Sequence, residues 1–285
     1  MLTLGIDTRP KLQPETFNRL RDLIYARCGI FFADSKKYLL ETRLVRRLEE
    51  RNLKTFEDYY YYLTYDTARE KEIHSLINSI VTNETSFFRD IAQLDAFKKG
   101  VIPKVMEEKA KSFDKTVRVW SAACSTGEEP YTLAMMMMEE GVQARGLGIE
   151  VYGSDICDNV LKSADAARYE KYSLRNTPEV YIKKYFEGGP DSFAVDRRLR
   201  GLVRLKKVNL IDQAATRAYK SIDVIFCRNV LIYFDDASKK KAVTHLYDSL
   251  SKGGYLFIGF SETLHNITRL FRPVSFERSV VYQKV

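Results

Sequence analysis

The spacing of hydrophobic positions changes once along the chain. From Pro14 to about Lys99, apolar residues recur every three or four positions, as in FNRLRDLIYARCGI, FEDYYYYLTYD and EIHSLINSIV, with short polar turns between these segments. This spacing is typical of amphipathic helices. The first part of the chain is therefore expected to form a small all-helical domain.

After Thr116 the pattern changes to short apolar runs separated by helix-like segments. The runs are VRVWSAA, IEVYGSDI, IDVIFC and GYLFIGF, and the intervening helices include EPYTLAMMMMEE and SKKKAVTHLYDSL. Buried strands that alternate with helices predict an α/β fold with a doubly wound, mostly parallel sheet. The final segment, SFERSVVYQKV, alternates like an antiparallel edge strand, so we expect the sheet to be mixed.

These patterns divide the chain into three parts. We expect an N-terminal helical domain over residues 1–95 and an α/β domain over residues 116–285. Residues 96–115 are expected to form a connecting helix that Gly100 and Pro103 interrupt.

Composition excludes several classes of protein. The chain has 285 residues, of which 45% are hydrophobic and 29% charged, as in an ordinary globular protein. Its four cysteines and three histidines show no spacing of a metal site, a disulfide framework or a Ser-His-Asp triad. No apolar run approaches the ~18 residues of a membrane span, and the first residues do not resemble a secretion signal. We therefore expect a cytoplasmic protein without a metal ion and without membrane insertion.

The net charge of +8 is concentrated in two stretches. Residues 1–56 hold 12 Lys+Arg against 7 Asp+Glu, and residues 162–207 hold 12 against 6. In the first stretch a leucine repeats every four residues from Leu40 to Leu48, which predicts a buried helical stripe with Arg43, Arg46 and Arg47 on other faces. A solvated helix face and a contact surface for an acidic partner both fit this pattern.

Ligands in a doubly wound sheet bind beyond the carboxyl ends of the strands. The first apolar run leads into the loop ACSTGEEP, where Glu128 and Glu129 would repel a pyrophosphate at the start of the following helix. A neutral or cationic ligand suits this loop better. Asp155 follows the next run, at the place where an acidic side chain can bind the two hydroxyls of a ribose.

Two further strand ends carry polar side chains. Asn209 and Asp212 follow the predicted strand GLVRLKKV, where they either border an adenine or cap a turn. Arg228, Asn229 and Tyr233 follow IDVIFC, where they face the cleft or serve the fold. Both interpretations remain open for each group.

Together the strand ends describe a ligand with a ribose and a cationic tail that carries no phosphate. Glu129 suits the cationic end, Asp155 the ribose and Asn209 the base. S-adenosylmethionine has this chemistry, and we expect it to be the cofactor.

The chain also resembles a known family. The strings VTNETSFFRD, RVWSAACSTGEEPYTLA, SDI, VNL and CRNVLIYFD occur in the order and spacing of the chemotaxis receptor methyltransferases, the CheR family, and the resemblance covers residues 14–285. It implies methyl transfer from S-adenosylmethionine to receptor glutamates, with S-adenosylhomocysteine as product. It also implies cofactor contacts by Asn83, Thr85, Arg89, Glu129, Asp155, Asn209, Leu210, Arg228 and Asn229, with Arg89 and Tyr233 near the transferred methyl group.

The resemblance further implies a partner. In the family the helical domain contacts the cytoplasmic helical bundle of methyl-accepting chemotaxis receptors, and this assigns Arg43, Arg46 and Arg47 to substrate binding. It implies a small antiparallel insertion over about residues 180–208. Members that grip a receptor tether peptide carry more glycines there than this chain does, which argues against tether binding.

Two other functions remain compatible with the sequence. The basic stretches also fit an RNA methyltransferase, although the tyrosines of DYYYYL lack the interleaved Arg and Lys of a base-stacking platform. A family member that binds the cofactor as a sensor, without transferring methyl groups, is the second. Against a sensory role, every residue assigned to the cofactor or the acceptor is present. We therefore expect neither nucleic acid as the partner nor a purely sensory role.

Overall fold

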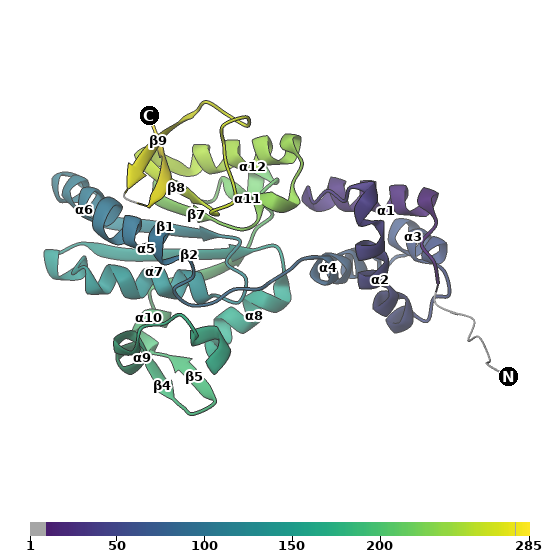
Figure 1. Cartoon of the computed structure of the whole chain (residues 1–285), viewed down its shortest axis with the longest axis horizontal. Coiled ribbons are helices and arrows are strands. Elements are labelled where there is room, and N and C mark those ends of the chain that lie inside the picture. The colour runs from purple at the N-terminus through teal and green to yellow at the C-terminus, as the bar shows by residue number, and fades with distance from the viewer. Residues whose placement is uncertain (1–9, 277) are drawn as a thin grey trace. The chain divides into compact units, whose positions relative to one another are not determined.

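The computed structural model describes residues 10–276 and 278–285. The chain forms two compact units that divide between Thr82 and Asn83 (Figure 1). The division therefore lies before the predicted boundary at residue 95. The reason is that the segment after Thr82 is hydrogen-bonded into the second unit, where the amide of Phe87 donates to the carbonyl of Ser173 at 2.9 Å.

The first unit is all-helical, as predicted. Its helices are α1 (Pro14–Cys28), the short 3₁₀ turn η1 (Asp34–Lys36), α2 (Lys37–Arg51), α3 (Phe56–Tyr65) and α4 (Arg69–Ile80). The leucine stripe of α2 is buried in its core, and Leu40 and Leu44 have no exposed surface. Burial of this stripe holds α2 in the unit.

A fully buried carboxylate joins three of these helices. Glu72 of α4 accepts hydrogen bonds from Arg47 Nη2 at 2.7 Å, Arg51 Nε at 2.5 Å and Tyr59 Oη at 2.8 Å. The Arg47 side chain is only 11% exposed. The sequence placed Arg47 on an open face, and this was wrong because Glu72, distant in sequence, draws the guanidinium inward.

The second unit contains the remaining elements. Its helices are α5 (Ile91–Asp95), η2 (Ala96–Val101), α6 (Ile102–Lys111), α7 (Glu128–Glu139), η3 (Gln143–Arg145), α8 (Asp158–Ala166), η4 (Lys171–Leu174), α9 (Glu179–Tyr185), α10 (Arg197–Arg200), α11 (Gln213–Thr216), η5 (Leu231–Tyr233) and α12 (Asp236–Ser249). Its strands are β1 (Thr116–Ala122), β2 (Gly148–Asp155), β3 (Arg168–Glu170), β4 (Phe186–Gly188), β5 (Ser192–Val195), β6 (Val203–Lys207), β7 (Ile222–Cys227), β8 (Leu250–Ile258), β9 (Phe271–Phe276) and β10 (Ser279–Lys284).

Seven strands form one sheet in the order β6-β2-β1-β7-β8-β10-β9. The first five are parallel, while β10 is antiparallel to both β8 and β9. The predicted mixed, mostly parallel sheet is confirmed. Val119 of β1 packs in a core with residues of α6 and α7, and its neighbour Trp120 faces the other way and stacks on Tyr219 at 4.2 Å. Helices flank the strands in Figure 1, and both faces of the sheet are covered.

Three short strands form a separate antiparallel sheet in the order β3-β5-β4. It spans residues 168–195, whereas the predicted insertion was about 180–208. The difference has a simple cause: β6 pairs in parallel with β2 and thus belongs to the main sheet.

The predicted connecting helix over 96–115 is part of the sheet unit. Between α5 and α6 the helix widens into the π-helical turn η2, because Pro103 has no amide hydrogen for a normal helical bond. Phe97 and Val101 of this turn are fully buried in the core of the sheet unit. Among the described residues, no helix is long and apolar enough to cross a membrane.

The ion cluster around Glu72 generates a stability prediction. We expect Glu72→Gln to lower the free energy of unfolding by about 3 kcal/mol, since it removes the charge of the fully buried carboxylate that Arg47 and Arg51 share. Urea denaturation followed by circular dichroism measures this loss. Glu50→Gln is the matched control, because Glu50 pairs with Arg47 at the surface, and we expect its midpoint to stay that of wild type. Equal midpoints for both variants would contradict the role of Glu72.

Candidate functional site

The carboxyl edge of the parallel strands carries a buried arginine with four partners. Arg228, directly after β7, donates from Nε to Glu129 Oε2 at 2.7 Å and from Nη1 to Gln93 Oε1 at 3.0 Å. The same Nη1 reaches the carbonyl of Arg89 at 3.1 Å and Asp90 Oδ2 at 3.2 Å. Its side chain is 4% exposed. The network thus ties the segment around Arg89 to the start of α7.

Glu129 is shared between two strand ends. Its second oxygen accepts a hydrogen bond from Ser121 Oγ of β1 at 2.6 Å. A cationic ligand that binds Glu129 would therefore share the carboxylate with Arg228 and Ser121. A carboxylate can accept about four hydrogen bonds, which leaves capacity for such a ligand.

Asp155 lies at the end of β2 and is nearly buried. Its carboxylate accepts hydrogen bonds from the amide of Ser125 at 2.9 Å and the amide of Cys157 at 3.0 Å, while Ser125 Oγ donates to the carbonyl of Asn83 at 2.9 Å. Burial raises the pKa of Asp155, and the backbone hydrogen bonds lower it in part. Asp155 therefore also holds two loops together, a role that the sequence did not indicate.

The loop before α7 does not form a phosphate cradle. Glu128 is buried, accepts hydrogen bonds from Thr126 Oγ1 at 2.7 Å and Ser173 Oγ at 3.1 Å, and has a pKa raised by burial. Gly127 has φ +95°, and a Cβ there would lie 2.8 Å from that of Ala164. The glycine thus serves close packing against α8. Acidic side chains at this helix start favour a ligand without phosphates.

Asn209 and Leu210 follow β6, next to the end of β2. The amide of Val208 donates to the carbonyl of Asp155 at 2.9 Å, which brings this turn beside the predicted ribose site. Asp212 caps a helix, which was one of its two predicted roles. Its side chain accepts hydrogen bonds from the amides at the start of α11. His245 Nδ1 lies 2.9 Å from the carbonyl of Leu210 and supports the turn from behind.

Asn229 and Tyr233 lie on one loop that a buried carboxylate holds. Glu262 accepts hydrogen bonds from the amides of Gly259 at 2.5 Å, Asn229 at 3.2 Å and Ile232 at 3.1 Å. These bonds hold Asn229 at φ 57° and fix the start of η5, which carries Tyr233. Burial raises the pKa of Glu262. Sequence analysis missed Glu262; its only signal was an acidic residue shortly after the apolar run GYLFIGF.

The remaining predicted residues lie in the segment before α5. Thr85 is partly buried, and Arg89 Nη1 donates to the carbonyl of Glu84 at 2.9 Å. Phe87 and Phe88 of the same segment are buried in the core of the sheet unit, so part of the segment serves packing. Among the residues described, no group of three or more His, Cys, Asp or Glu side chains is placed to hold a metal ion.

A doubly wound sheet with an acidic residue at the end of its second strand and no phosphate cradle defines a class of protein. This arrangement is that of the S-adenosylmethionine-dependent methyltransferases, and its carboxylate acceptors fit the hydroxyls of a ribose and a cationic group. The cofactor, when bound, supplies an electrophilic methyl group.

Comparison with known proteins places the chain within this class. A family model described as "CheR methyltransferase, SAM binding domain" matches residues 83–280, and "CheR methyltransferase, all-alpha domain" matches residues 15–81. The chain belongs to the CheR methyltransferase family, and S-adenosylmethionine is its cofactor.

Three curated relatives illustrate the similarity. Chemotaxis protein methyltransferase 2 of Vibrio cholerae serotype O1 is 36% identical over 94% of this chain and 92% of its own length. The chemotaxis protein methyltransferase of Borreliella burgdorferi is 34% identical over 93% of this chain and 94% of its own. The chemotaxis protein methyltransferase of Escherichia coli K12 is 33% identical over 95% of this chain and 92% of its own length.

The geometry around Asp155 generates a binding prediction. We expect Asp155→Asn to weaken S-adenosylmethionine binding at least tenfold, because an amide cannot accept from both loops and both ribose hydroxyls at once. Titration calorimetry on the folded variant measures the affinity. Asp158→Asn is the control, since that neighbouring carboxylate pairs with Lys207 at the surface. Unchanged affinity in a folded Asp155→Asn protein would remove Asp155 from the ribose site.

Proposed function

We propose that this methyltransferase forms methyl esters on glutamate side chains of the cytoplasmic helices of chemotaxis receptors. The observation that carries the proposal is the similarity to chemotaxis protein methyltransferases over more than nine-tenths of both chains. The helical and sheet units both fall within the matched region. A cytoplasmic location follows from this substrate.

The chemistry of the acceptor fits the residues available. A glutamate has an ordinary pKa near ~4.3 and is ionised at neutral pH, so no general base is needed. The chain has three histidines, and His245 lies near the candidate site. Its Nδ1 is hydrogen-bonded to the carbonyl of Leu210. The task of the protein is to align a carboxylate oxygen with the methyl group and to exclude water.

We assign this alignment to Arg89 and Tyr233. The guanidinium of Arg89 orients the acceptor carboxylate, and the hydroxyl of Tyr233 donates a hydrogen bond to it. Glu262 and Arg228 act indirectly. Glu262 holds the backbone of the loop that carries Tyr233, and Arg228 holds the backbone of Arg89. The methyl ester is neutral, so each turnover removes one negative charge from the acceptor helix.

The receptor contact is assigned to the exposed face of α2. Of the three predicted arginines, Arg43 donates to the carbonyl of Ile80 and to Thr82 Oγ1, and Arg47 is buried against Glu72. Arg46 remains, with its side chain 84% exposed. Tyr38, two turns earlier on the same face, is 67% exposed. An exposed arginine and tyrosine suit contact with an acidic helix.

The activity is tested by transfer of a radiolabelled methyl group from S-adenosylmethionine to receptor-containing membranes. We expect label on the receptor that alkali releases as methanol, which is diagnostic of a carboxyl methyl ester. Label that is stable to alkali, or label on RNA added in parallel, would contradict the proposal. Cofactor binding with no transfer to any receptor would favour a sensory role.

Tyr233→Phe tests the assignment of the acceptor site. We expect kcat to fall about tenfold to a hundredfold, because a hydrogen bond to a charged group is lost, while cofactor affinity stays within twofold. Single-turnover methylation and calorimetry measure the two quantities. Tyr172→Phe, at an exposed tyrosine of the same unit, is the control. A normal rate for Tyr233→Phe would leave Tyr233 with a packing role alone.

Arg46→Glu tests the receptor surface. We expect a higher KM for receptor, an unchanged affinity for S-adenosylmethionine, and a weaker salt dependence than wild type. Arg19→Glu is matched to it, since Arg19 forms the same kind of exposed i,i+4 pair with Glu15 on α1. If both variants methylate receptor with the same KM at every salt concentration, α2 is a solvated face.

A further inference from the structure

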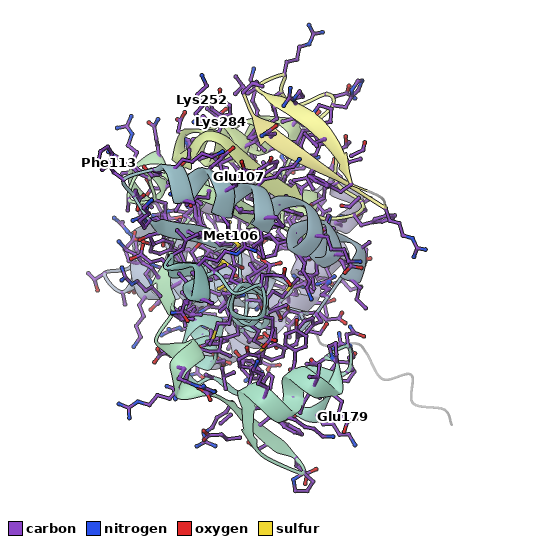
Figure 2. All side chains as sticks on the ribbon, turned by 90° about the vertical axis from the view of Figure 1, so that its left-hand side faces the viewer. Met106, Glu107, Phe113, Glu179, Lys252 and Lys284 are labelled. Atoms are coloured by element: carbon purple, nitrogen blue, oxygen red, sulfur yellow. The ribbon has the colours of Figure 1, made fainter. Side chains whose placement is uncertain are left out.

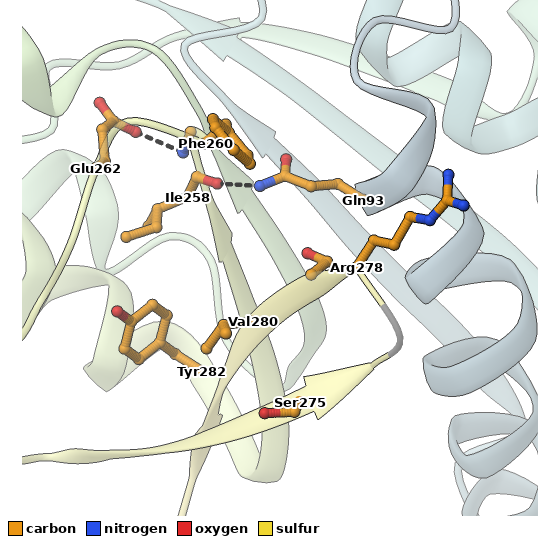
Figure 3. Close-up of a pocket in the computed structure, with 10 residues that line it drawn as sticks. Gln93, Ile258, Phe260, Glu262, Ser275, Arg278, Val280 and Tyr282 are labelled. Carbon is orange, nitrogen blue, oxygen red and sulfur yellow. Dashed lines mark hydrogen bonds between the residues drawn. The ribbon is translucent and has the colours of Figure 1, made fainter.

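A hollow of about 500 Å³ opens beyond the ends of β8 and the start of β10 (Figure 3). Its walls include Gln93, Ile258, Phe260, Glu262, Arg278 and Val280. It lies entirely within the sheet unit and is separate from the residues assigned to the cofactor.

Strand order, together with the predicted cofactor residues, gives the expected position of the methyl group relative to this hollow. The predicted cofactor residues follow β6, β2, β1 and β7, which are consecutive neighbours in the sheet. Asn209 suits the base and Asp155 the ribose, and the cationic end lies at Glu129 and Arg228, so the cofactor is expected to run along the edge from β6 to β7. The next strands in the same direction are β8 and β10. Their edge is therefore the side from which an acceptor can approach.

Two residues that line the hollow are hydrogen-bonded to residues of the candidate site. Gln93 connects the two, because its Oε1 accepts from Arg228 at 3.0 Å and its Nε2 donates to the carbonyl of Ile258 at 2.6 Å. Glu262 lines the hollow and holds the loop of Asn229 and Tyr233 from the same position. An acceptor bound in the hollow would thus contact Gln93 and Glu262, which hold Arg228 and the loop of Tyr233 in place.

We propose that this hollow is the acceptor subsite, which receives the part of an acidic helix that flanks the methylated glutamate. The inference rests on the proposed function and adds a place for the substrate chain on the sheet unit. Phe260 is 84% exposed and Val280 48%, an unusual exposure for apolar side chains beside a site, and both suit the apolar positions of an amphipathic helix.

Charge identifies the occupant as acidic. Arg278 is exposed at the rim and also lines a smaller adjoining hollow, where Lys99 is paired with Asp95 at 3.6 Å. Glu262 is the one carboxylate among the described residues that line the hollow, and it is turned toward backbone amides, with Gly259 at 2.5 Å. Figure 3 shows this bond. The positive charge of Arg278 at the rim therefore complements an acidic segment.

The test compares Phe260→Ala and Arg278→Glu with matched variants at the other end of the parallel strands, where these strands begin. Phe113→Ala and Lys252→Glu are the controls, since both residues are exposed near the starts of β1 and β8 and face the viewer in Figure 2. We expect Phe260→Ala to raise the KM for receptor about tenfold and Arg278→Glu to raise it severalfold, most at low salt. The affinity for S-adenosylhomocysteine should stay within twofold in all four variants.

Each result bears on a distinct claim. If wild type labels receptor and all four variants share its KM, the hollow is not the acceptor subsite, while the proposed function stands. If Phe260→Ala weakens S-adenosylhomocysteine binding as much as it raises KM, the hollow belongs to the cofactor site and the inference is overturned. If wild type labels no receptor, both the proposed function and this occupant fail.

Discussion

One buried guanidinium holds the sheet unit's candidate site together. Arg228 is 4% exposed and meets two carboxylates, an amide and a backbone carbonyl that come from two separate parts of the chain. Removing it would leave Glu129 buried beside Ser121 without its counter-charge. Lysine could not replace it, because an ammonium lacks the planar fork of five donors that reaches this many acceptors.

The same guanidinium explains why the segment from Asn83 to Asp90 behaves as part of the sheet unit. The sequence indicates helices on both sides of this segment but gives no sign of where the units divide. Besides the bond from Phe87 to Ser173, two hydrogen bonds join the segment to the sheet unit: Arg228 to the carbonyl of Arg89, and Ser125 to the carbonyl of Asn83. Both join residues far apart in sequence, and spacing alone carries no information about such contacts.

What the sequence predicted well depends on periodicity. The helical unit, the parallel sheet and its antiparallel end follow from apolar spacings of about 3.6 and 2, and acidic residues at strand ends follow from the sheet topology. What it missed depends on tertiary contacts. Arg46 and Arg47 are neighbours of the same type, yet one is exposed and one is buried, because a carboxylate on another helix lies opposite only one of them. Glu262 was missed for the same reason, since its partners are backbone amides.

The distribution of charge at the site has a consequence for the proposed reaction. Glu128, Glu129, Asp155 and Glu262 all lie at or near the carboxyl edge, whereas Arg228 is consumed by Glu129 and Asp90. An anionic acceptor therefore gains little general attraction from this edge, which is why the proposed reaction assigns its counter-charge to Arg89. Weak binding of the ground-state anion favours turnover, because only interactions that strengthen as the carboxylate loses its charge to the methyl group lower the barrier. The affinity for receptor must then come from contacts that do not involve the reacting carboxylate itself, which is the role proposed for α2 and for the hollow beside β8.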